Sequence, residues 1–351
     1  MEQNKTIITT RFSEELNLVI ENTDFDKLFV LTDENTKRFC LPELTACKCM
    51  KDFQLISLPE GDESKNIESA VKIWQFLTEH KATRKSLMIN LGGGMITDIG
   101  GFTASTFKRG IRYINVSTTL LGAVDAATGG KTGINFLGYK NEIGVFSPAL
   151  AVLINIDFFK TLSIENIRSG FAEMVKHALI DTDEEWNKLL KFDLENIDFN
   201  ELRQLLEKSI RVKERIVKED PKEQNIRKAL NLGHTFGHAF ESFSYRAHQP
   251  VLHGYAVIWG TLCELYLSVL KLGFPKEELL RLKYLIKEYY PVKLNFSCND
   301  YEALLELMTH DKKNESDEIN FTLLGNVGDI RINQTARKEE IYECLDFFRE
   351  G

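Results

Sequence analysis

Short apolar runs alternate with helical patterns in the first half of the chain, and this alternation is the feature that most constrains the fold. The apolar runs are KLFVLTD at 27–33, SLMINLG at 86–92 and YINVSTT at 113–119, and a helical pattern fills 67–80. Alternation of this kind predicts a parallel sheet with helices on its faces. The run at 151–163 has the pattern of one last strand followed by a turn.

The second half of the chain has a different pattern. From residue 164 onward nearly every apolar run has helical spacing, as in SGFAEMVKHALI and GYAVIWGTLCELYLSVLKLG. We therefore expect an α/β domain at 1–160 and a mostly α-helical domain at 161–351.

Composition excludes several classes of protein. The 351 residues are 43% hydrophobic and 27% charged, which is typical of a folded globular protein, and the net charge is −8. This charge argues against a nucleic acid or an anionic membrane as the main partner. The N-terminus lacks a signal-peptide core and no run reaches ~18 apolar residues, so we expect a cytoplasmic protein. We expect the cysteines to be core or surface thiols without disulfides: Cys40, Cys47, Cys49, Cys263, Cys298 and Cys344.

Three consecutive glycines, Gly92 to Gly94, separate a predicted strand from a predicted helix. Glycine permits positive φ and close backbone approach, and helix N-termini attract anions, so the junction is suited to phosphate. The spacing is not G-x-G-x-x-G, because Thr97 stands at the last glycine position. On this stretch alone, an ordinary tight turn is the favoured interpretation.

A second glycine-rich segment follows. Gly129 and Gly130 precede Lys131, and Thr118, Thr119 and Thr132 lie nearby in the sequence as small hydroxyl donors. Two glycine-rich turns with lysines indicate at least two bound anionic groups.

Histidines in the second half have metal-ligand spacing. His234 and His238 stand at i and i+4 of a predicted helix, and His253 follows in VLHGYAV. Glu173, in SGFAEMVKH, is a candidate third ligand. Spacing does not distinguish this site from a core histidine, nor Glu173 from a surface ion pair with Lys176. The basic residues Lys213, Arg227, Lys312 and Lys313 likewise have the ordinary interpretation of solvated surface charges.

Eight ordered sequence blocks resemble the signature blocks of 3-dehydroquinate synthases. They are GGGMITDIGGF, KRG, STTLLGAVDAATGGKTGIN, KNEIG, SGFAEMVKH, RKALNLGHTFGHAFE, HGYAV and HDKK, and the resemblance covers roughly residues 26 to 330. It implies a Rossmann-like nucleotide-binding α/β domain followed by a helical domain that binds metal and substrate.

The resemblance also implies an activity. Enzymes of this family use NAD and a divalent metal, zinc or cobalt, to convert 3-deoxy-D-arabino-heptulosonate 7-phosphate (DAHP) into 3-dehydroquinate and phosphate. A substrate hydroxyl is oxidised transiently by NAD, phosphate is eliminated, the ketone is reduced, and the ring opens and closes as a carbocycle. This is the second step of the shikimate pathway, and the family resemblance implies a homodimer.

Site residues are carried over from the family position by position. The implied metal ligands are Glu173, His234 and His253, with His238 available for proton transfer or substrate contact. The implied cradle for the substrate phosphate is Lys131, Asn141, one or both of Lys312 and Lys313, and Arg109 from the partner subunit. The positions implied for the substrate carboxylate and hydroxyls are Lys176, Lys213, Arg227 and Asn231, with Glu223 beside them and Asp125 shared with the cofactor. The implied NAD contacts are Asp33, Asp62, Lys65, Gly93, Gly94, Met95, Asp98, Thr118, Thr119, Leu121, Asp125, Lys140, Phe158 and Thr161.

Three positions depart from the family pattern. Ser117 replaces a proline, Asp62 replaces the glutamate of the E-x-x-K cofactor motif, and Tyr255 replaces a glutamate after His253 and Gly254. We expect Asp62 to reach less far towards the cofactor, and the change at residue 255 to alter the support of His253.

Three other functions compete with this interpretation. Another sugar-phosphate cyclase would act on a substrate without the carboxylate, and retention of Lys213, Arg227 and Asn231 disfavours it. A glycerol-dehydrogenase-like enzyme would accumulate NADH. A non-catalytic NAD-binding module would have no use for the metal-ligand set.

Overall fold

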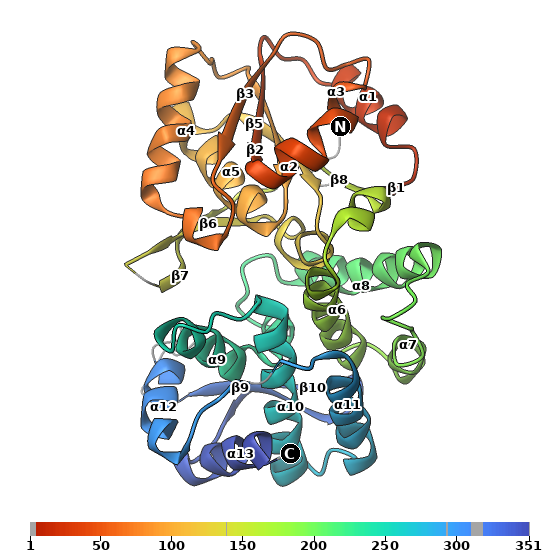
Figure 1. The fold of residues 1–351 in the computed structure, drawn as a ribbon, viewed down its shortest axis with the longest axis vertical. Coiled ribbons are helices and arrows are strands. Elements are labelled where there is room, and N and C mark those ends of the chain that lie inside the picture. Colours follow the sequence, from red (N-terminus) through yellow and green to blue (C-terminus); the bar gives the residue numbers. More distant parts are fainter. Residues whose placement is uncertain (1–4, 138, 293, 310–318, 351) are drawn as a thin grey trace. The chain divides into compact units, whose positions relative to one another are not determined.

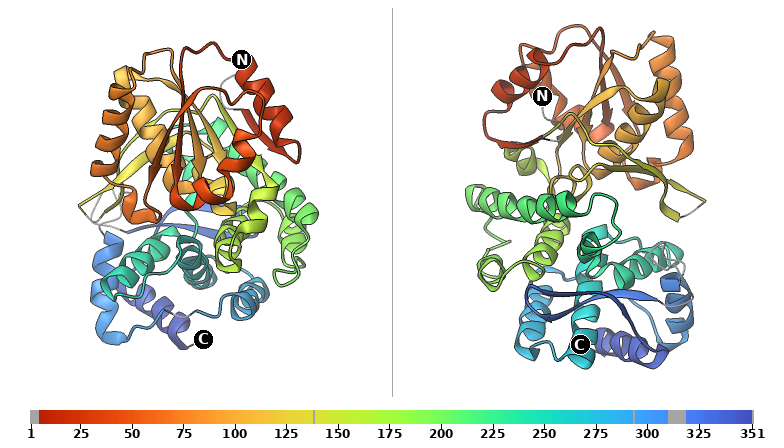
Figure 2. Two further views of the ribbon diagram at one scale, coloured as in Figure 1. Left: turned by 45° about the horizontal axis from the view of Figure 1, so that its top comes forward. Right: turned by 180° about the vertical axis from the view of Figure 1, so that it is seen from behind.

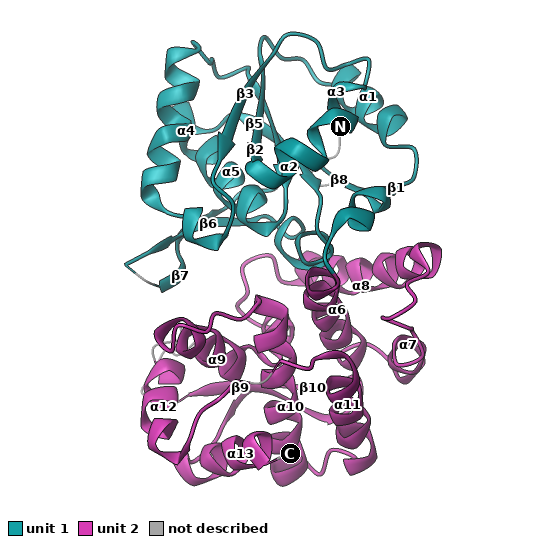
Figure 3. Ribbon diagram, viewed as in Figure 1, with its two compact units in different colours: residues 1–163 teal, residues 164–351 magenta. Residues whose placement is uncertain are grey.

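The computed structural model describes residues 5–137, 139–292, 294–309 and 319–350. They form two compact units, Met1–Ser163 and Ile164–Gly351 (Figure 3).

Unit 1 is built on a six-stranded parallel sheet with the strand order β1-β8-β5-β4-β2-β3 (Figure 1). Its strands are β1 (Lys5–Thr9), β2 (Leu28–Asp33), β3 (Phe53–Leu58), β4 (Leu87–Gly92), β5 (Arg112–Ser117) and β8 (Ala151–Asn155). Its helices are α1 (Phe12–Glu21), α2 (Glu34–Phe39), α3 (Leu41–Thr45), α4 (Ile67–Glu79) and α5 (Gly94–Thr106), with short helical turns at η1 (Asp62–Ser64), η2 (Phe107–Arg109), η3 (Gly122–Ala126) and η4 (Ile156–Thr161). The predicted alternation of strands and helices is confirmed.

The central strands explain why the sequence pattern was strong. Every residue of β4 is buried and β2 is buried up to its last residue, as expected for parallel strands covered on both faces. Helix α4 begins where the side chain of Asn66 accepts a hydrogen bond from the Ser69 N–H at 2.9 Å.

A hairpin extends from unit 1 that the sequence pattern did not predict. Strands β6 (Lys131–Phe136) and β7 (Tyr139–Phe146) pair antiparallel, with Gly133 opposite Gly144. A Cβ added to Gly144 would lie 2.3 Å from the Thr132 carbonyl oxygen, so the strands approach where they carry no side chains. Gly133 and Gly144 are therefore pairing positions of the hairpin. Gly129 and Gly130, which indicated the second turn, have φ 103° and 71° and stand directly before β6.

Unit 2 is mostly helical, as predicted. Its helices are α6 (Ile164–Leu179), α7 (Asp183–Leu189), α8 (Phe199–Glu219), α9 (His234–Arg246), α10 (His253–Leu272), α11 (Lys276–Tyr289), α12 (Tyr301–Thr309) and α13 (Lys338–Glu350), with turns at η5 (Ile226–Asn231) and η6 (Cys298–Asp300). An antiparallel hairpin, β9 (Asn320–Asn326) and β10 (Asp329–Thr335), crosses this unit beside its helices (Figure 2) and was not predicted.

Helix α10 is the core of unit 2, where it packs against α6, α9, α11, α13 and β9. Among the described residues it alone is long and apolar enough to cross a membrane, but 72% of its apolar window is buried. That degree of burial is typical of a core helix, and its first residue, His253, lies where α9 and α6 also meet α10.

Candidate functional site

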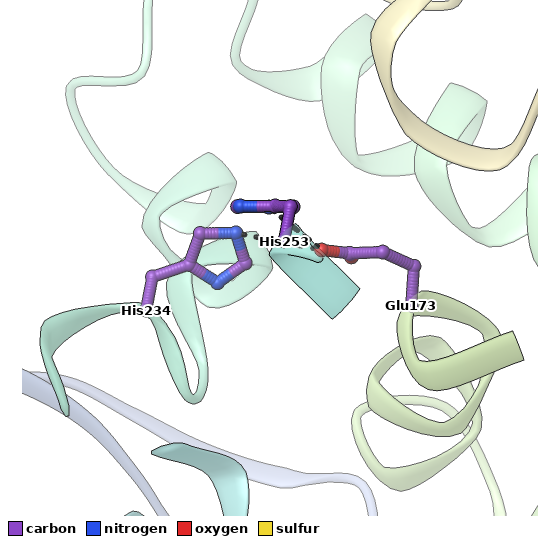
Figure 4. A group of neighbouring side chains, drawn as sticks. All are labelled: Glu173, His234 and His253. Atoms are coloured by element: carbon purple, nitrogen blue, oxygen red, sulfur yellow. Dashed lines mark ion pairs between the residues drawn. The ribbon is translucent and has the colours of Figure 1, made fainter. Parts of the chain in front are cut away.

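Three ligand-type side chains converge in unit 2. Glu173 comes from the middle of α6, while His234 and His253 are the first residues of α9 and α10 (Figure 4). One ligand atom from each lies within 4.8 Å of the others. Oε1 of Glu173 lies 3.6 Å from Nε2 of His234 and 3.6 Å from Nε2 of His253. Two imidazoles and a carboxylate around one point are a donor set for zinc or a similar divalent ion.

A hydrogen bond at Nδ1 orients each of the two histidine rings. Nδ1 of His234 lies 3.1 Å from the Leu232 carbonyl oxygen, and Nδ1 of His253 lies 2.9 Å from Oε2 of Glu241. Because these oxygens accept hydrogen bonds, they favour a hydrogen on Nδ1 and leave Nε2 to face Glu173. Glu241 had no predicted role, although it stands within the GHAFE block.

Burial of Glu173 rules out the surface ion pair that spacing left open. Glu173 is 0% exposed and Lys176 is 1% exposed, and the Lys176 ammonium contacts Oε2 of Glu173. One carboxylate oxygen therefore faces a cation while the other faces the two histidines.

The two carboxylates around His253 favour the protonated form of its ring. Burial opposes the charge on His253, but the carboxylates of Glu241 and Glu173 raise its pKa to about 10. A protonated imidazole cannot bind a metal, so binding of a cation at this site displaces that proton.

His238 stands beside the same cluster. Its ring centroid lies 5.1 Å from that of His234 and 6.0 Å from that of His253. The i, i+4 pair on α9 thus brings two imidazoles together, and the first of them, His234, belongs to the ligand cluster.

Lys213 and Arg227 are buried, so the surface-charge interpretation is wrong for these two residues. Lys213 is 5% exposed and Arg227 is 2% exposed. Arg227 donates from Nη1 to the Pro221 carbonyl at 2.7 Å, and Asn231 donates to Oε1 of Glu223 at 2.9 Å. Lys312 and Lys313 lie outside the described residues.

One carboxylate that was not predicted shapes the segment that holds Arg227 and Asn231. Asp220 accepts hydrogen bonds from the backbone N–H groups of Gln224 at 3.0 Å, Asn225 at 2.6 Å and Arg227 at 3.1 Å. A carboxylate that collects backbone donors in this way fixes the course of a turn.

In unit 1, the predicted cofactor residues form a polar network around Lys65. Its ammonium lies 3.1 Å from Asp98 and 2.7 Å from Asn141, and 3.5 Å from Asp62. Burial raises the pKa of Asp98 to about 6, against the opposing effect of Lys65. Lys140 contacts the second oxygen of Asp62, so the shorter acid keeps two lysine partners.

Asn135 connects this network to the β6–β7 hairpin and was not predicted. Its amide donates to Oδ2 of Asp62 at 2.8 Å, and its carbonyl accepts the Asn141 N–H at 2.9 Å. Asn141 has a left-handed backbone, with φ 52°, so this bond stabilises an uncommon conformation.

The glycine run is needed for space rather than for unusual backbone angles. Gly93 has φ −76°, and a Cβ added there would lie 2.9 Å from Cγ2 of Thr119. The run therefore brings the start of α5 close to Thr118 and Thr119, and positive φ, which glycine also permits, is not used at Gly93.

The other predicted residues of unit 1 lie in or beside its helices, turns and strands. Asp33 caps α2, and Lys131 begins β6. Met95 lies in the first turn of α5, Leu121 and Asp125 lie at η3, and Phe158 and Thr161 lie in η4. Arg109, at the end of η2, has φ 68° and lines an open cavity of about 580 Å³ together with Ala82, Thr83, Arg84, Lys85 and Lys108.

The departure at Tyr255 does not remove the bond that orients His253. Tyr255 is buried, and its ring packs edge-on against Tyr290 at 5.0 Å and Trp259 at 6.1 Å. The carboxylate that contacts Nδ1 of His253 is that of Glu241. Ser117, the last residue of β5, is buried.

Sequence comparisons match this chain to one protein family. Residues 55–169 match the family described as 3-dehydroquinate synthase N-terminal, and residues 170–314 match 3-dehydroquinate synthase C-terminal. A 3-dehydroquinate synthase from Parabacteroides distasonis is 53% identical over 351 residues, covering 100% of this chain and 99% of that protein.

Two solved structures share the fold. A 2-epi-5-epi-valiolone synthase from Streptomyces hygroscopicus with bound NAD⁺ and Zn²⁺ has a TM-score of 0.89 at 22% identity, covering 100% of this chain and 98% of that one. A 2-deoxy-scyllo-inosose synthase complexed with carbaglucose-6-phosphate, NAD⁺ and Co²⁺ has a TM-score of 0.87 at 20% identity, covering 100% and 99%. At these identities the structures establish a common fold.

Proposed function

The chain belongs to the 3-dehydroquinate synthase family, and we propose that it converts DAHP into 3-dehydroquinate and phosphate as the second step of the shikimate pathway. The substrate hydroxyl is oxidised, phosphate is eliminated beside the new ketone, the ketone is reduced, and the opened ring closes by an intramolecular aldol reaction. The hydride that leaves the substrate returns to it in the same turnover, so no net redox change results.

One observation carries this proposal at the level of the site: Glu173, His234 and His253 converge with two oriented imidazoles and a buried carboxylate. This donor set fits zinc or cobalt. When bound, the ion would polarise the hydroxyl that is oxidised and NAD would accept and return its hydride.

The chain's own residues bind and orient the substrate in this proposal. Lys176, Lys213, Arg227 and Asn231 hold its carboxylate and hydroxyls, with Glu223 fixing the amide of Asn231 at 2.9 Å. Burial of the cationic groups supports this role, because charge-assisted hydrogen bonds are stronger away from water. His238, one turn from His234, moves a proton to or from the substrate.

The residues of unit 1 take the cofactor and the phosphate group in this proposal. The Lys65 network and the glycine run bind NAD through Asp33, Asp62, Lys65, Gly93, Gly94, Met95, Asp98, Thr118, Thr119, Leu121, Asp125, Lys140, Phe158 and Thr161. Lys131 and Asn141 bind the substrate phosphate, together with Lys312 or Lys313.

We further propose a cytoplasmic homodimer in which Arg109 completes the partner's site. The position of Arg109 among other basic side chains around an open cavity supports an anionic contact there. Mixing inactive Arg109→Ala and His253→Ala proteins at equal amounts should restore about a quarter of wild-type turnover, since half the dimers then hold one complete site. No recovery after subunit exchange would place Arg109 in its own chain's site.

The activity is tested by following phosphate release from DAHP with catalytic NAD, while NADH absorbance is recorded in the same cuvette. We expect stoichiometric phosphate and dehydroquinate without NADH accumulation, loss of turnover with a chelator, and recovery with zinc. Steady NADH formation from simple polyols would instead identify a dehydrogenase. Phosphate release only from sugar phosphates without a carboxylate would identify another cyclase.

A further inference from the structure

A buried carboxylate on α10 has no part in the proposed reaction. Glu264 is 0% exposed. Its Oε2 accepts a hydrogen bond from the Gly233 N–H at 2.6 Å, and its Oε1 accepts one from the Thr235 N–H at 3.1 Å. These two N–H groups flank His234 on either side, so both carboxylate oxygens bind the backbone that carries a metal ligand.

The start of α9 needs an acceptor from elsewhere in the fold. The first N–H groups of a helix have no partner within it, and a Ser, Thr, Asp or Asn side chain usually supplies one. Here the N-cap residue is Gly233, with φ 80° and no side chain. A Cβ at Gly233 would lie 2.2 Å from Oγ1 of Thr261, so no such residue fits. Glu264 supplies the missing acceptor, and its negative charge suits a helix N-terminus.

Glycines at the same place let helices α9 and α10 approach closely. A Cβ on Gly260 would lie 2.0 Å from the Gly233 carbonyl oxygen, and one on Gly237 would lie 3.1 Å from the Ala256 carbonyl oxygen. Helices α9 and α10 thus touch backbone to backbone beside His234. Small displacements of the first turn of α9 would change the distance between His234 and His253.

Each of the helices α9 and α10 provides a glutamate that contacts the start of the other helix. Glu241 of α9 reaches His253 at the start of α10, and Glu264 of α10 reaches the residues around His234 at the start of α9. The first bond orients a ligand ring directly, whereas the second acts on the backbone of a ligand.

We propose that Glu264 is a positioning residue for the metal site, holding His234 at the distance from His253 and Glu173 that a divalent ion requires. This inference rests on the proposed metal-dependent function. Glu264 touches neither substrate nor cofactor in it, and its effect passes through the backbone of residues 233 to 235.

The test is Glu264→Gln in the full chain. Glutamine has nearly the same shape, but it offers one oxygen where two N–H groups need acceptors, and its amide group opposes the second of them. We expect zinc and cobalt affinity, measured by competition with a chromophoric chelator, to fall about 10–100-fold. We also expect the visible absorption of the cobalt protein to change, because the ligand geometry changes.

Thr182→Ala is the matched control. Thr182 accepts the Glu185 N–H at 3.3 Å as the N-cap of α7, a helix of the same unit that carries no proposed ligand. This variant should lose stability while keeping the metal affinity and the cobalt spectrum of the wild type. An equal loss of affinity in both variants, or an unchanged affinity and spectrum in Glu264→Gln, would overturn the proposal.

Hydrogen exchange on the wild type provides a second test in case Glu264→Gln does not fold. The N–H groups of Gly233 and Thr235 should be protected in the metal-free protein, because Glu264 holds them before metal binds. Rapid exchange that slows only when metal is added would contradict this. Failure of the wild type to bind any divalent ion would instead remove the proposed function, and this inference with it.

Discussion

Oε2 of Glu241 lies 2.9 Å from Nδ1 of His253, and this contact determines which nitrogen of the ring is available to a metal. Glu241 is buried on α9, while His253 begins the next helix along the chain. The carboxylate on α9 therefore orients the first residue of α10, so that Nε2 of His253 faces Glu173.

Removal of this carboxylate should weaken metal binding without removing a ligand. Glu241→Ala is expected to lower zinc or cobalt affinity about 10–100-fold, and Glu241→Gln, which keeps an oxygen acceptor, should lower it less. Competition with a chromophoric chelator measures both. Glu207→Ala on α8, where Glu207 pairs with Arg203 at 3.3 Å, is a control for the lost charge and should bind metal normally. Normal affinity in Glu241→Ala would show that His253 is oriented by other contacts.

His253→Ala removes a proposed ligand itself. We expect loss of bound metal and of turnover, while the Kd for NAD stays within a few-fold, since the glycine run and the Lys65 network belong to unit 1. Elemental analysis, turnover and NAD titration measure the three properties separately. Turnover equal to that of the wild type would exclude His253 from the ligand set.

The parallel sheet could be predicted because its evidence is local. Strands β2, β4, β5 and β8 are mostly apolar runs between helical patterns, as expected for strands buried inside a covered sheet. The β6–β7 hairpin gives no such signal, because Gly133 and Gly144 interrupt the apolar alternation where its strands lie closest.

The site could be predicted only in part for a related reason. Lys213 and Arg227 are charged residues on helical segments, a pattern that resembles a solvated surface, and only the tertiary packing buries them. Glu241 and Glu264 are likewise ordinary helical glutamates in sequence. Their roles depend on contacts with the first residues of neighbouring helices, which no local pattern contains.

Tyr255→Phe tests whether the departure at residue 255 affects the metal site. The contacts of Tyr255 with Tyr290 and Trp259 are between rings, and phenylalanine keeps them. We expect the free energy of unfolding to change by about 1 kcal/mol or less, with metal affinity within two-fold of the wild type. Chemical denaturation and chelator competition measure these. A large loss of metal affinity would mean that the hydroxyl supports His253.

Asn135→Ala should weaken NAD binding through the hairpin. It removes the bond to Asp62 and the one that holds the left-handed backbone of Asn141, whose side chain contacts Lys65. Two lost hydrogen bonds correspond to at most roughly 5–150-fold in Kd. Calorimetric titration with NAD measures the change, and Asn17→Ala, which removes a bond to the Cys49 N–H at 2.9 Å elsewhere in unit 1, is the control. Equal Kd values for Asn135→Ala and the wild type would separate Asn135 from the cofactor site.

Asp220→Asn should show a pH-dependent loss of stability. Burial raises the pKa of Asp220, but the N–H donors of Asn225, Gln224 and Arg227 and the Arg227 charge lower it below its ordinary value overall. A carboxyl with a lowered pKa stabilises the folded state above its unfolded pKa of about 3.9, and this contribution disappears as pH falls through the folded pKa.

The difference in unfolding free energy between wild type and Asp220→Asn should therefore be largest near neutral pH and shrink in acid. Urea denaturation at a series of pH values measures it, and other carboxyl groups cancel because both proteins contain them. A difference that stays constant into acid would show that the ionised form of Asp220 does not stabilise the turn that carries Arg227.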